Sequence, residues 1–203
     1  MQQKTSRRAT HSMMLSVVAI LFCLLLWGVQ GVWVLYGSAS NVMSQVGLQR
    51  SRVERLTKDA LIIVGPMGQP SNFTDAVSEI QNTLPGWQQS QKGLQIGDAS
   101  LGLPPRPPAN IVLPLIQSQA DFSAITTALQ NIVVKPTRQS TLMNIQLQII
   151  LDHEPAYYQA LSQVNTFWKQ RIDDTFFRLF WIETSFVVGI ALCTIFQAIF
   201  RGK

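Results

Sequence analysis

Basic residues gather in one short segment, residues 47–58, which reads GLQRSRVERLTK. Arg50 carries a guanidinium, whose planar fork of N–H donors matches the acceptor oxygens of a small oxyanion. Gly47 precedes it by three residues, so on a helix the two share a face and the glycine leaves space beside the arginine. The chemistry of the segment is therefore compatible with a small-anion site at Arg50 and Gly47.

A solvated helix face explains the same charges. Opposite charges four residues apart stabilise an exposed helix. The segment and its next residue contain three such pairs, namely Arg50–Glu54, Glu54–Lys58 and Arg55–Asp59. Surface or interface pairing is the simpler interpretation of Arg50, and the residues alone leave both interpretations open.

Two long apolar runs flank the segment that would hold this site. Residues 13–36 contain no charged residue, and residues 179–200 contain only Glu183. A membrane-spanning helix needs about 20 mostly apolar residues, whereas a core helix of that length normally has a polar face. We predict transmembrane helices at 13–36 and 176–200. The first is longer than the roughly 7–15 apolar residues of a signal peptide, so we interpret it as an uncleaved anchor.

The charges indicate which way the chain crosses the membrane. The net charge is +5, yet residues 37–175 contain ten basic and ten acidic residues. The excess lies in residues 1–12 and 201–203, and positive residues that flank spans stay cytoplasmic. We therefore expect both termini in the cytoplasm and residues 37–175 as an extracytoplasmic domain of a two-pass protein in the cell membrane. The positive net charge is then explained by the orientation of the chain in the membrane, and it gives no support to nucleic-acid binding.

No pattern in the sequence indicates catalysis. There is no P-loop, GxSxG, HExxH or CxxC motif. His11 and His153 are expected on opposite sides of the membrane, and the consecutive residues Asp152, His153 and Glu154 point to different faces of a helix. Cys23 and Cys193 fall in the apolar runs, so the exported domain has no disulfide. We expect no enzyme activity, no metal and no cofactor.

Apolar residues recur at three or four positions through residues 37–175, which predicts an all-α domain. Helices are expected at 40–64, from Ser71 or Asn72 to Leu84, at 111–134, and from Ser140 onward into the second span. Pro85-Gly86 is expected to kink or shorten the second helix, which the next residues could resume, and Pro155 to kink the last. Gly93 to Asn110, with four prolines and three glycines, is a predicted loop.

Two stretches resemble PilJ-type sensor domains. Residues 47–58 are similar to that family's G-R-Q-R-M-L-S-Q-R-I-A-K signature after the first membrane helix. The matching residues are Gly47, Gln49, Arg50, Arg55 and Lys58, and the departures are Leu48, Ser51, Arg52, Val53, Glu54 and Thr57. Residues 97–104 (GDASLGLP) resemble the family's G-D-x-x-L-G-L-P loop between its second and third helices, and Trp168 matches a tryptophan near the end of the last helix.

Members of this family are input domains of pilus-linked chemotaxis transducers, and nitrate/nitrite-responsive sensor kinases have a similar domain. The resemblance implies an extracytoplasmic antiparallel four-helix bundle between two transmembrane helices, forming a homodimer through its first helix. It also implies that Arg50 and Gly47 bind a small anion across the dimer interface, and that Gln49, Arg55 and Lys58 belong to the first-helix motif.

We therefore predict a membrane-anchored sensory input module of a signal-transduction system that lies in the lipid bilayer and passes a helix movement onward. Only Arg201, Gly202 and Lys203 follow the second span, so we expect either that the output is a separate protein, such as a histidine kinase or a chemotaxis transducer, or that the chain is a truncated input half. The alternative is a structural membrane protein that scaffolds a cell-envelope complex.

Overall fold

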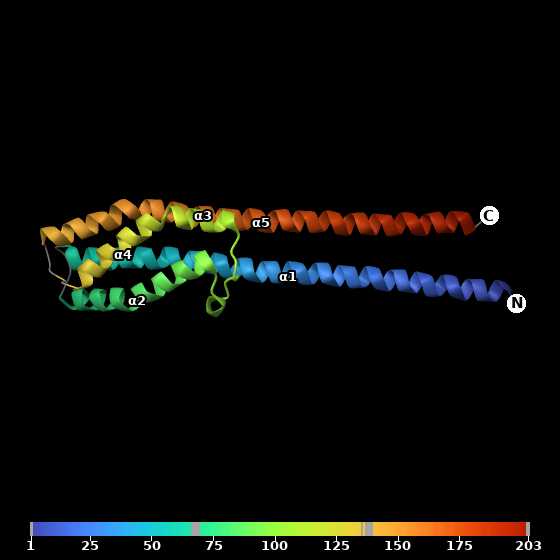
Figure 1. Ribbon diagram of the computed structural model, residues 1–203, viewed down its shortest axis with the longest axis horizontal. Coiled ribbons are helices and arrows are strands. Elements are labelled where there is room, and N and C mark those ends of the chain that lie inside the picture. The colour runs from blue at the N-terminus through green and yellow to red at the C-terminus, as the bar shows by residue number, and fades with distance from the viewer. Residues whose placement is uncertain (1, 66–69, 135, 137–139, 202–203) are drawn as a thin grey trace. The chain divides into compact units, whose positions relative to one another are not determined.

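The computed structural model describes the backbone of residues 2–65, 70–134, 136 and 140–201, and all regular structure in these residues is helical (Figure 1). The helices are α1 (Gln2–Val64), α2 (Pro70–Ile96), the short 3-10 helix η1 (Ala99–Leu101), α3 (Ala109–Gln117), α4 (Gln119–Val134) and α5 (Thr141–Arg201). The predicted all-α class is confirmed, and these residues contain no strand.

The chain divides into two compact units, one of Met1–Gly37 with Arg171–Lys203 and one of Ser38–Gln170. Many side chains of the first unit are not described, so most of the predicted span 13–36 and the end of the predicted span 176–200 lie outside the described side chains. Within the part that is described, no helix has a stretch both long enough and apolar enough to cross a membrane.

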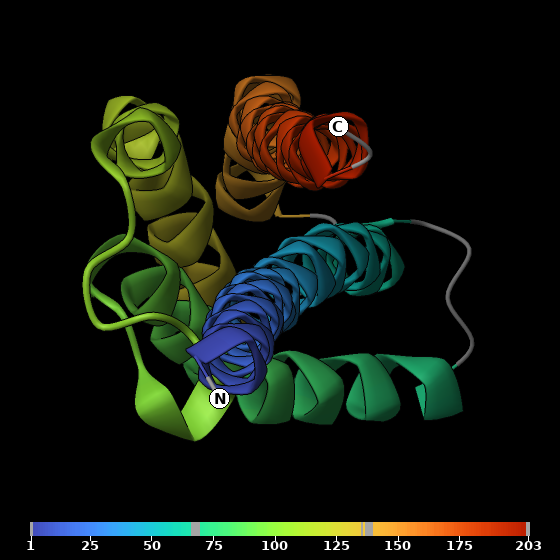
Figure 2. The ribbon, with the colours of Figure 1, turned by 90° about the vertical axis from the view of Figure 1, so that its right-hand side faces the viewer.

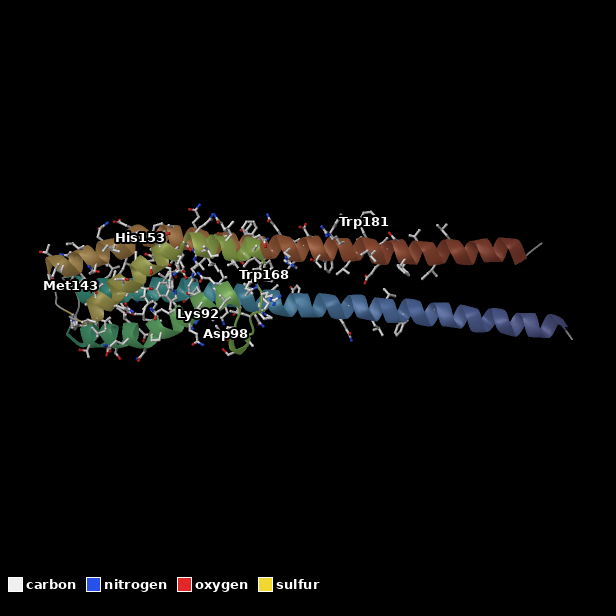
Figure 3. The ribbon with its side chains drawn as sticks, viewed as in Figure 1. Lys92, Asp98, Met143, His153, Trp168 and Trp181 are labelled. Carbon is white, nitrogen blue, oxygen red and sulfur yellow. The ribbon has the colours of Figure 1, made fainter. Side chains whose placement is uncertain are left out.

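Where the first unit does have described side chains, α5 exposes large apolar groups on all sides. Trp181, labelled in Figure 3, is 54% exposed, and its ring packs edge-on against Phe177 at a centroid distance of 6.0 Å. Other exposed apolar residues follow over the next three turns, among them Ile182, Phe186, Val187, Val188, Ile190 and Leu192. This part of α5 lacks the polar stripe that an amphipathic surface helix has.

The second unit, Ser38–Gln170, has a shared apolar core. Its helices reverse direction along the chain, with α2 running back along α1 and α5 running back along α3 and α4 (Figure 1). The stripes predicted from the three-and-four spacing meet in this core. Its fully buried side chains include Leu56, Ile80, Leu94, Ile125, Leu129 and Ile150.

The second helix is longer than the sequence pattern predicted. It continues through Pro85 and ends at Ile96, so the predicted start of the loop at Gly93 is wrong. Gly97 has φ +89°, a left-handed conformation that ends the helix, and its N–H bonds to the Gly93 carbonyl at 2.8 Å. The helix therefore ends before Gly97, which has a left-handed backbone, whereas Gly93 lies inside the helix.

The predicted single helix 111–134 is wrong, because it is two helices that meet at Ser118. Pro114 lies inside α3, and its missing N–H removes only the bond to the carbonyl four residues earlier. The Ser118 N–H bonds to the Pro114 carbonyl at 3.0 Å, and Ser118 then leaves the helical conformation with φ −85° and ψ 7°. The Ser118 carbonyl accepts the Phe122 N–H at 2.9 Å, which begins α4.

The loop between α2 and α3, drawn in light green in Figures 1 and 2, is built by local hydrogen bonds. Asp98, labelled in Figure 3, caps η1 by accepting bonds from the Ser100 N–H at 2.9 Å and the Ser100 hydroxyl at 2.6 Å. These bonds lower the pKa of Asp98. Gly102 has φ +66°, and its carbonyl accepts a bond from Asn41 Nδ2 of α1 at 3.1 Å. The stretch 97–104 therefore fixes the end of α2 against α1.

Candidate functional site

The predicted anion-binding residues lie on an exposed face of α1, which we call the Arg50 face and define by Gly47, Arg50 and Glu54. Gly47 is exposed, and a Cβ added to it would meet nothing within 4 Å. The Arg50 and Glu54 side chains are 66% and 59% exposed, and Arg50 Nε lies 3.5 Å from Glu54 Oε1. The face has the open space that a ligand or a second chain needs, but its guanidinium already has a carboxylate partner.

α5 contributes two residues beside the Arg50 face. The Arg50 guanidinium carbon lies 5.2 Å from the centre of the Tyr158 ring, within cation–π range. The Tyr158 hydroxyl donates a long bond of 3.5 Å to the Arg50 carbonyl. Burial, together with the neighbouring carboxylates of Glu154 and Glu54, raises the pKa of Tyr158, and burial raises that of Glu154. The negative potential of two carboxylates at this edge opposes anion binding by a single chain.

The remaining residues of the first-helix motif have separate roles. Arg55 does not pair with Asp59 as the spacing predicted, because it crosses to α2 and binds Glu79 at 3.0 Å. Glu79 also accepts the Thr83 hydroxyl at 2.9 Å. Lys58 is exposed, and Gln49 points in the opposite direction, into the core. The structure therefore brings Gly47 and Arg50 together and separates Gln49 from them.

A buried polar cluster lies on that opposite side of α1. We call it the Tyr157 layer and define it by Gln49, Trp87, Gln91 and Tyr157, which are all 2% exposed or less. The Tyr157 hydroxyl lies 3.1 Å from Gln49 Oε1 and 2.9 Å from Gln91 Oε1. Gln49 Nε2 donates to the backbone carbonyl of Trp87 at 3.0 Å. The layer thus joins α1, α2 and α5 by hydrogen bonds inside the core.

Aromatic rings enclose the Tyr157 layer. Trp87 packs against Phe122 of α4 at 4.4 Å and against Tyr157 at 5.6 Å, the second contact being edge to face. One turn before Tyr157, His153 of α5 bonds to Asp121 in the first turn of α4, with Nδ1 and Oδ1 2.7 Å apart (His153 is labelled in Figure 3). Burial raises the pKa of Tyr157, so its hydroxyl stays protonated and remains a donor at neutral pH.

Sequence reasoning missed the Tyr157 layer, although a signal was present. Gln49 occupies a stripe position between Val46 and Val53, and Gln91 does so between Trp87 and Leu94. A glutamine at an apolar stripe position predicts a buried polar group that needs a partner. The partner itself, Tyr157, is 108 residues from Gln49, and spacing alone could not identify it.

Asp59 is a buried acidic residue of α1. It is 9% exposed, and its Oδ2 has no hydrogen-bond partner among the described residues. Burial and the nearby Glu79 raise the pKa of Asp59, although Arg55 and Lys58 oppose them. The described residues contain no group of three or more His, Cys, Asp or Glu side chains that could hold a metal ion.

Comparisons with known proteins add no relatives: the chain matches no family model, no curated protein and no solved structure.

Proposed function

We propose that this protein is a membrane-anchored sensory input module. In this proposal residues 37–175 are an extracytoplasmic antiparallel four-helix bundle between transmembrane helices at 13–36 and 176–200. The observation that carries it is the length of α1 and α5, which have 63 and 61 residues and contribute to both units of the chain. A helix is a rod with about 1.5 Å of rise per residue, so it can carry a small displacement from one unit to the other.

The placement in the membrane is supported by the sequence and by α5. The run 13–36 has no charge, the basic excess flanks the two runs, and the exposed apolar residues after Phe176 lie on all sides of α5. Phe177, Phe180 and Trp181 at the start of that stretch suit the membrane interface, where aromatic residues are enriched. Both termini are then cytoplasmic, and the lipid bilayer is the partner of these helices.

The proposed ligand is a small anion at Arg50 and Gly47, bound between two copies of the chain. Its support is the open space at Gly47 and the exposure of Arg50. The Glu54 carboxylate at 3.5 Å must then yield to the anion, as expected of a weak exposed ion pair. Two Arg50 side chains that face each other across a twofold axis repel when empty, and an anion between them removes that repulsion.

Thermal unfolding of the full chain in detergent tests the anion. Nitrate or nitrite should raise the melting temperature more than chloride does at equal ionic strength, and Arg50→Ala should abolish the rise. Arg106→Ala, in an exposed part of the loop between α2 and α3, is the matched control and should keep it. If no anion in a panel shifts the wild-type protein, the anion-sensor proposal is wrong.

A scaffold for an envelope complex is the second candidate, and one observation favours it. Arg50 already contacts Glu54 and the Tyr158 ring, so it is satisfied without a ligand. Affinity purification of the full chain separates the two functions. A histidine kinase or chemotaxis transducer among the partners supports the sensor, whereas recovery of envelope assembly proteins alone supports the scaffold.

A further inference from the structure

The hydrogen bonds of the Tyr157 layer cannot all form in the orientation given above. A phenol has one hydrogen and can donate it to one acceptor at a time. Both neighbours of the Tyr157 hydroxyl are carbonyl oxygens, Gln49 Oε1 and Gln91 Oε1. Gln91 Nε2, meanwhile, is a buried donor without an acceptor among the described residues, and the indole Nε1 of Trp87 makes no hydrogen bond of good geometry there, although it lies near the Tyr157 hydroxyl. Two donors lack a well-placed acceptor where two acceptors compete for one hydrogen.

A half-turn of one amide group resolves this conflict. Gln49 is held in place, because its Nε2 donates to the Trp87 carbonyl at 3.0 Å. Gln91 has no such constraint. Turning its amide lets Gln91 Nε2 donate to the Tyr157 oxygen, while Tyr157 donates its own hydrogen to Gln49. The Gln91 oxygen then takes the former position of Nε2, and Trp87 lies one helical turn earlier on the same face of α2.

We propose that these groups form a closed hydrogen-bond circuit that locks the register of α5 against α1 and α2. In the circuit the Trp87 indole donates to the Gln91 oxygen, Gln91 donates to Tyr157, Tyr157 donates to Gln49, and Gln49 donates to the Trp87 carbonyl. It starts and ends on Trp87 and passes through three helices. Sliding α5 along α1 breaks it at the phenol and leaves buried polar groups unpaired, which is strongly unfavourable.

The circuit differs from the apolar core around it in directionality. Leu and Ile contacts can re-form after a helix slides, because apolar packing is not directional. A hydrogen bond at 2.9 or 3.1 Å tolerates little displacement. Buried polar residues fix register in this way in coiled coils. The significance of the lock for signalling rests on the proposed function, because α1 and α5 are the helices that would carry the movement.

The test compares three apolar substitutions inside the layer with three matched ones outside it. Spin labels are placed at two exposed positions, Ser51→Cys on α1 and Ser162→Cys on α5, in the full chain with Cys23 and Cys193 changed to alanine. The distance between the labels is measured by pulsed electron paramagnetic resonance. The test variant combines Gln49→Met, Tyr157→Phe and Gln91→Met. The control combines Leu48→Met, Gln81→Met and Gln159→Met, which lie at exposed positions on the same three helices.

The test variant should stay helical, because it removes the three hydrogen-bonding side chains together and leaves only the Trp87 indole N–H of the circuit without an acceptor. Its distance distribution should broaden or gain a second population, displaced by up to one turn of about 5.4 Å. The control should keep a single narrow distribution. A folded test variant with the wild-type distribution would overturn the register lock. If that variant does not fold, Tyr157→Phe alone takes its place under the same criterion.

A second measurement tests the circuit itself. Of the five tryptophan indole N–H signals in the proton NMR spectrum, that of Trp87 alone should move upfield in Gln91→Met, because it loses its acceptor. An unchanged Trp87 signal would show that the amide does not accept from the indole. Neither measurement uses a ligand, so a failure here leaves the anion test unaffected, and a failure of the anion test leaves the register lock in place.

Discussion

Gln49 and Arg50 are neighbours on α1, and Tyr157 and Tyr158 are neighbours on α5, yet each pair is divided between two environments. Gln49 and Tyr157 are fully buried and bonded to each other at 3.1 Å. Arg50 and Tyr158 meet at the surface through a 5.2 Å ring contact and a long 3.5 Å hydrogen bond. The same two helices thus form a directional contact inside and a loose one outside. We expect the Tyr157 layer to determine stability and the Arg50 face to be free for binding.

The largest expected effect comes from removing the aromatic wall of the Tyr157 layer. Trp87 is fully buried and packs against both Phe122 and Tyr157. Trp87→Ala should lower the free energy of unfolding by about 3–5 kcal/mol, through lost burial and the cavity it leaves. Denaturant titration followed by circular dichroism measures it. Trp181→Ala, at a side chain that is 54% exposed, should lower the free energy of unfolding by less than about 1 kcal/mol. Equal losses in Trp87→Ala and Trp181→Ala would show that the Tyr157 layer does not determine stability.

The two tyrosines give the most direct comparison. Tyr157→Phe should lower the free energy of unfolding by about 1–3 kcal/mol, because it leaves glutamine amides buried without a partner. Tyr158→Phe removes a long hydrogen bond at a partly exposed position, where water can replace it, and should change the free energy of unfolding by less than about 0.5 kcal/mol. Parallel denaturant titrations of the two variants measure both values. If Tyr158→Phe lowered the free energy of unfolding more than Tyr157→Phe does, the surface contact and not the buried layer would be the more stabilising of the two.

A smaller effect is expected from pH at Asp59, on the buried side of α1. Because the pKa of Asp59 is raised on folding, the folded chain binds a proton there more readily than the unfolded chain. The associated stability is present below the ordinary value of 3.8 and is lost as the pH rises through the folded pKa. Asp59→Asn should therefore raise the melting temperature at pH 7 and leave it unchanged near pH 3.

The exposed Asp75 provides the control for this pH effect, since Asp75→Asn should change the melting temperature little at either pH. A gain in Asp59→Asn that is equally large at both values would exclude ionisation as its cause.

The smallest effect should be a gain on the Arg50 face. Gly47 lies inside α1 with open space around its Cβ position, so Gly47→Ala should raise the free energy of unfolding by about 0.5–1 kcal/mol. If the glycine serves the proposed anion site, the same variant should lose the nitrate response while gaining stability. A Gly47→Ala variant that is more stable and fully responsive would separate Gly47 from ligand binding.

The helices could be predicted from the sequence because apolar stripes repeat along them, and Val64 and Val134 end helices where the pattern does. The break at Ser118 could not be placed, because the nearest proline, Pro114, lies one turn before it and accepts the Ser118 N–H as any helical residue would. The exposed positions of Gly47 and Arg50 followed from local spacing. Tyr157 did not, because its partners belong to helices that are distant in sequence. The anion itself stays a prediction.

The adjacency of Gln49 and Arg50 limits how α1 can turn. One residue corresponds to about 100° around a helix axis. Rotating α1 by that angle would bring the guanidinium toward the core in place of the glutamine, and burying an unpaired charge costs several kcal/mol. Large twisting of α1 against the other helices is therefore blocked in this direction. Because the Tyr157 layer also opposes axial sliding, the movements that remain are small tilts, so a label that reports rotation about the α1 axis should record almost no change on stimulation.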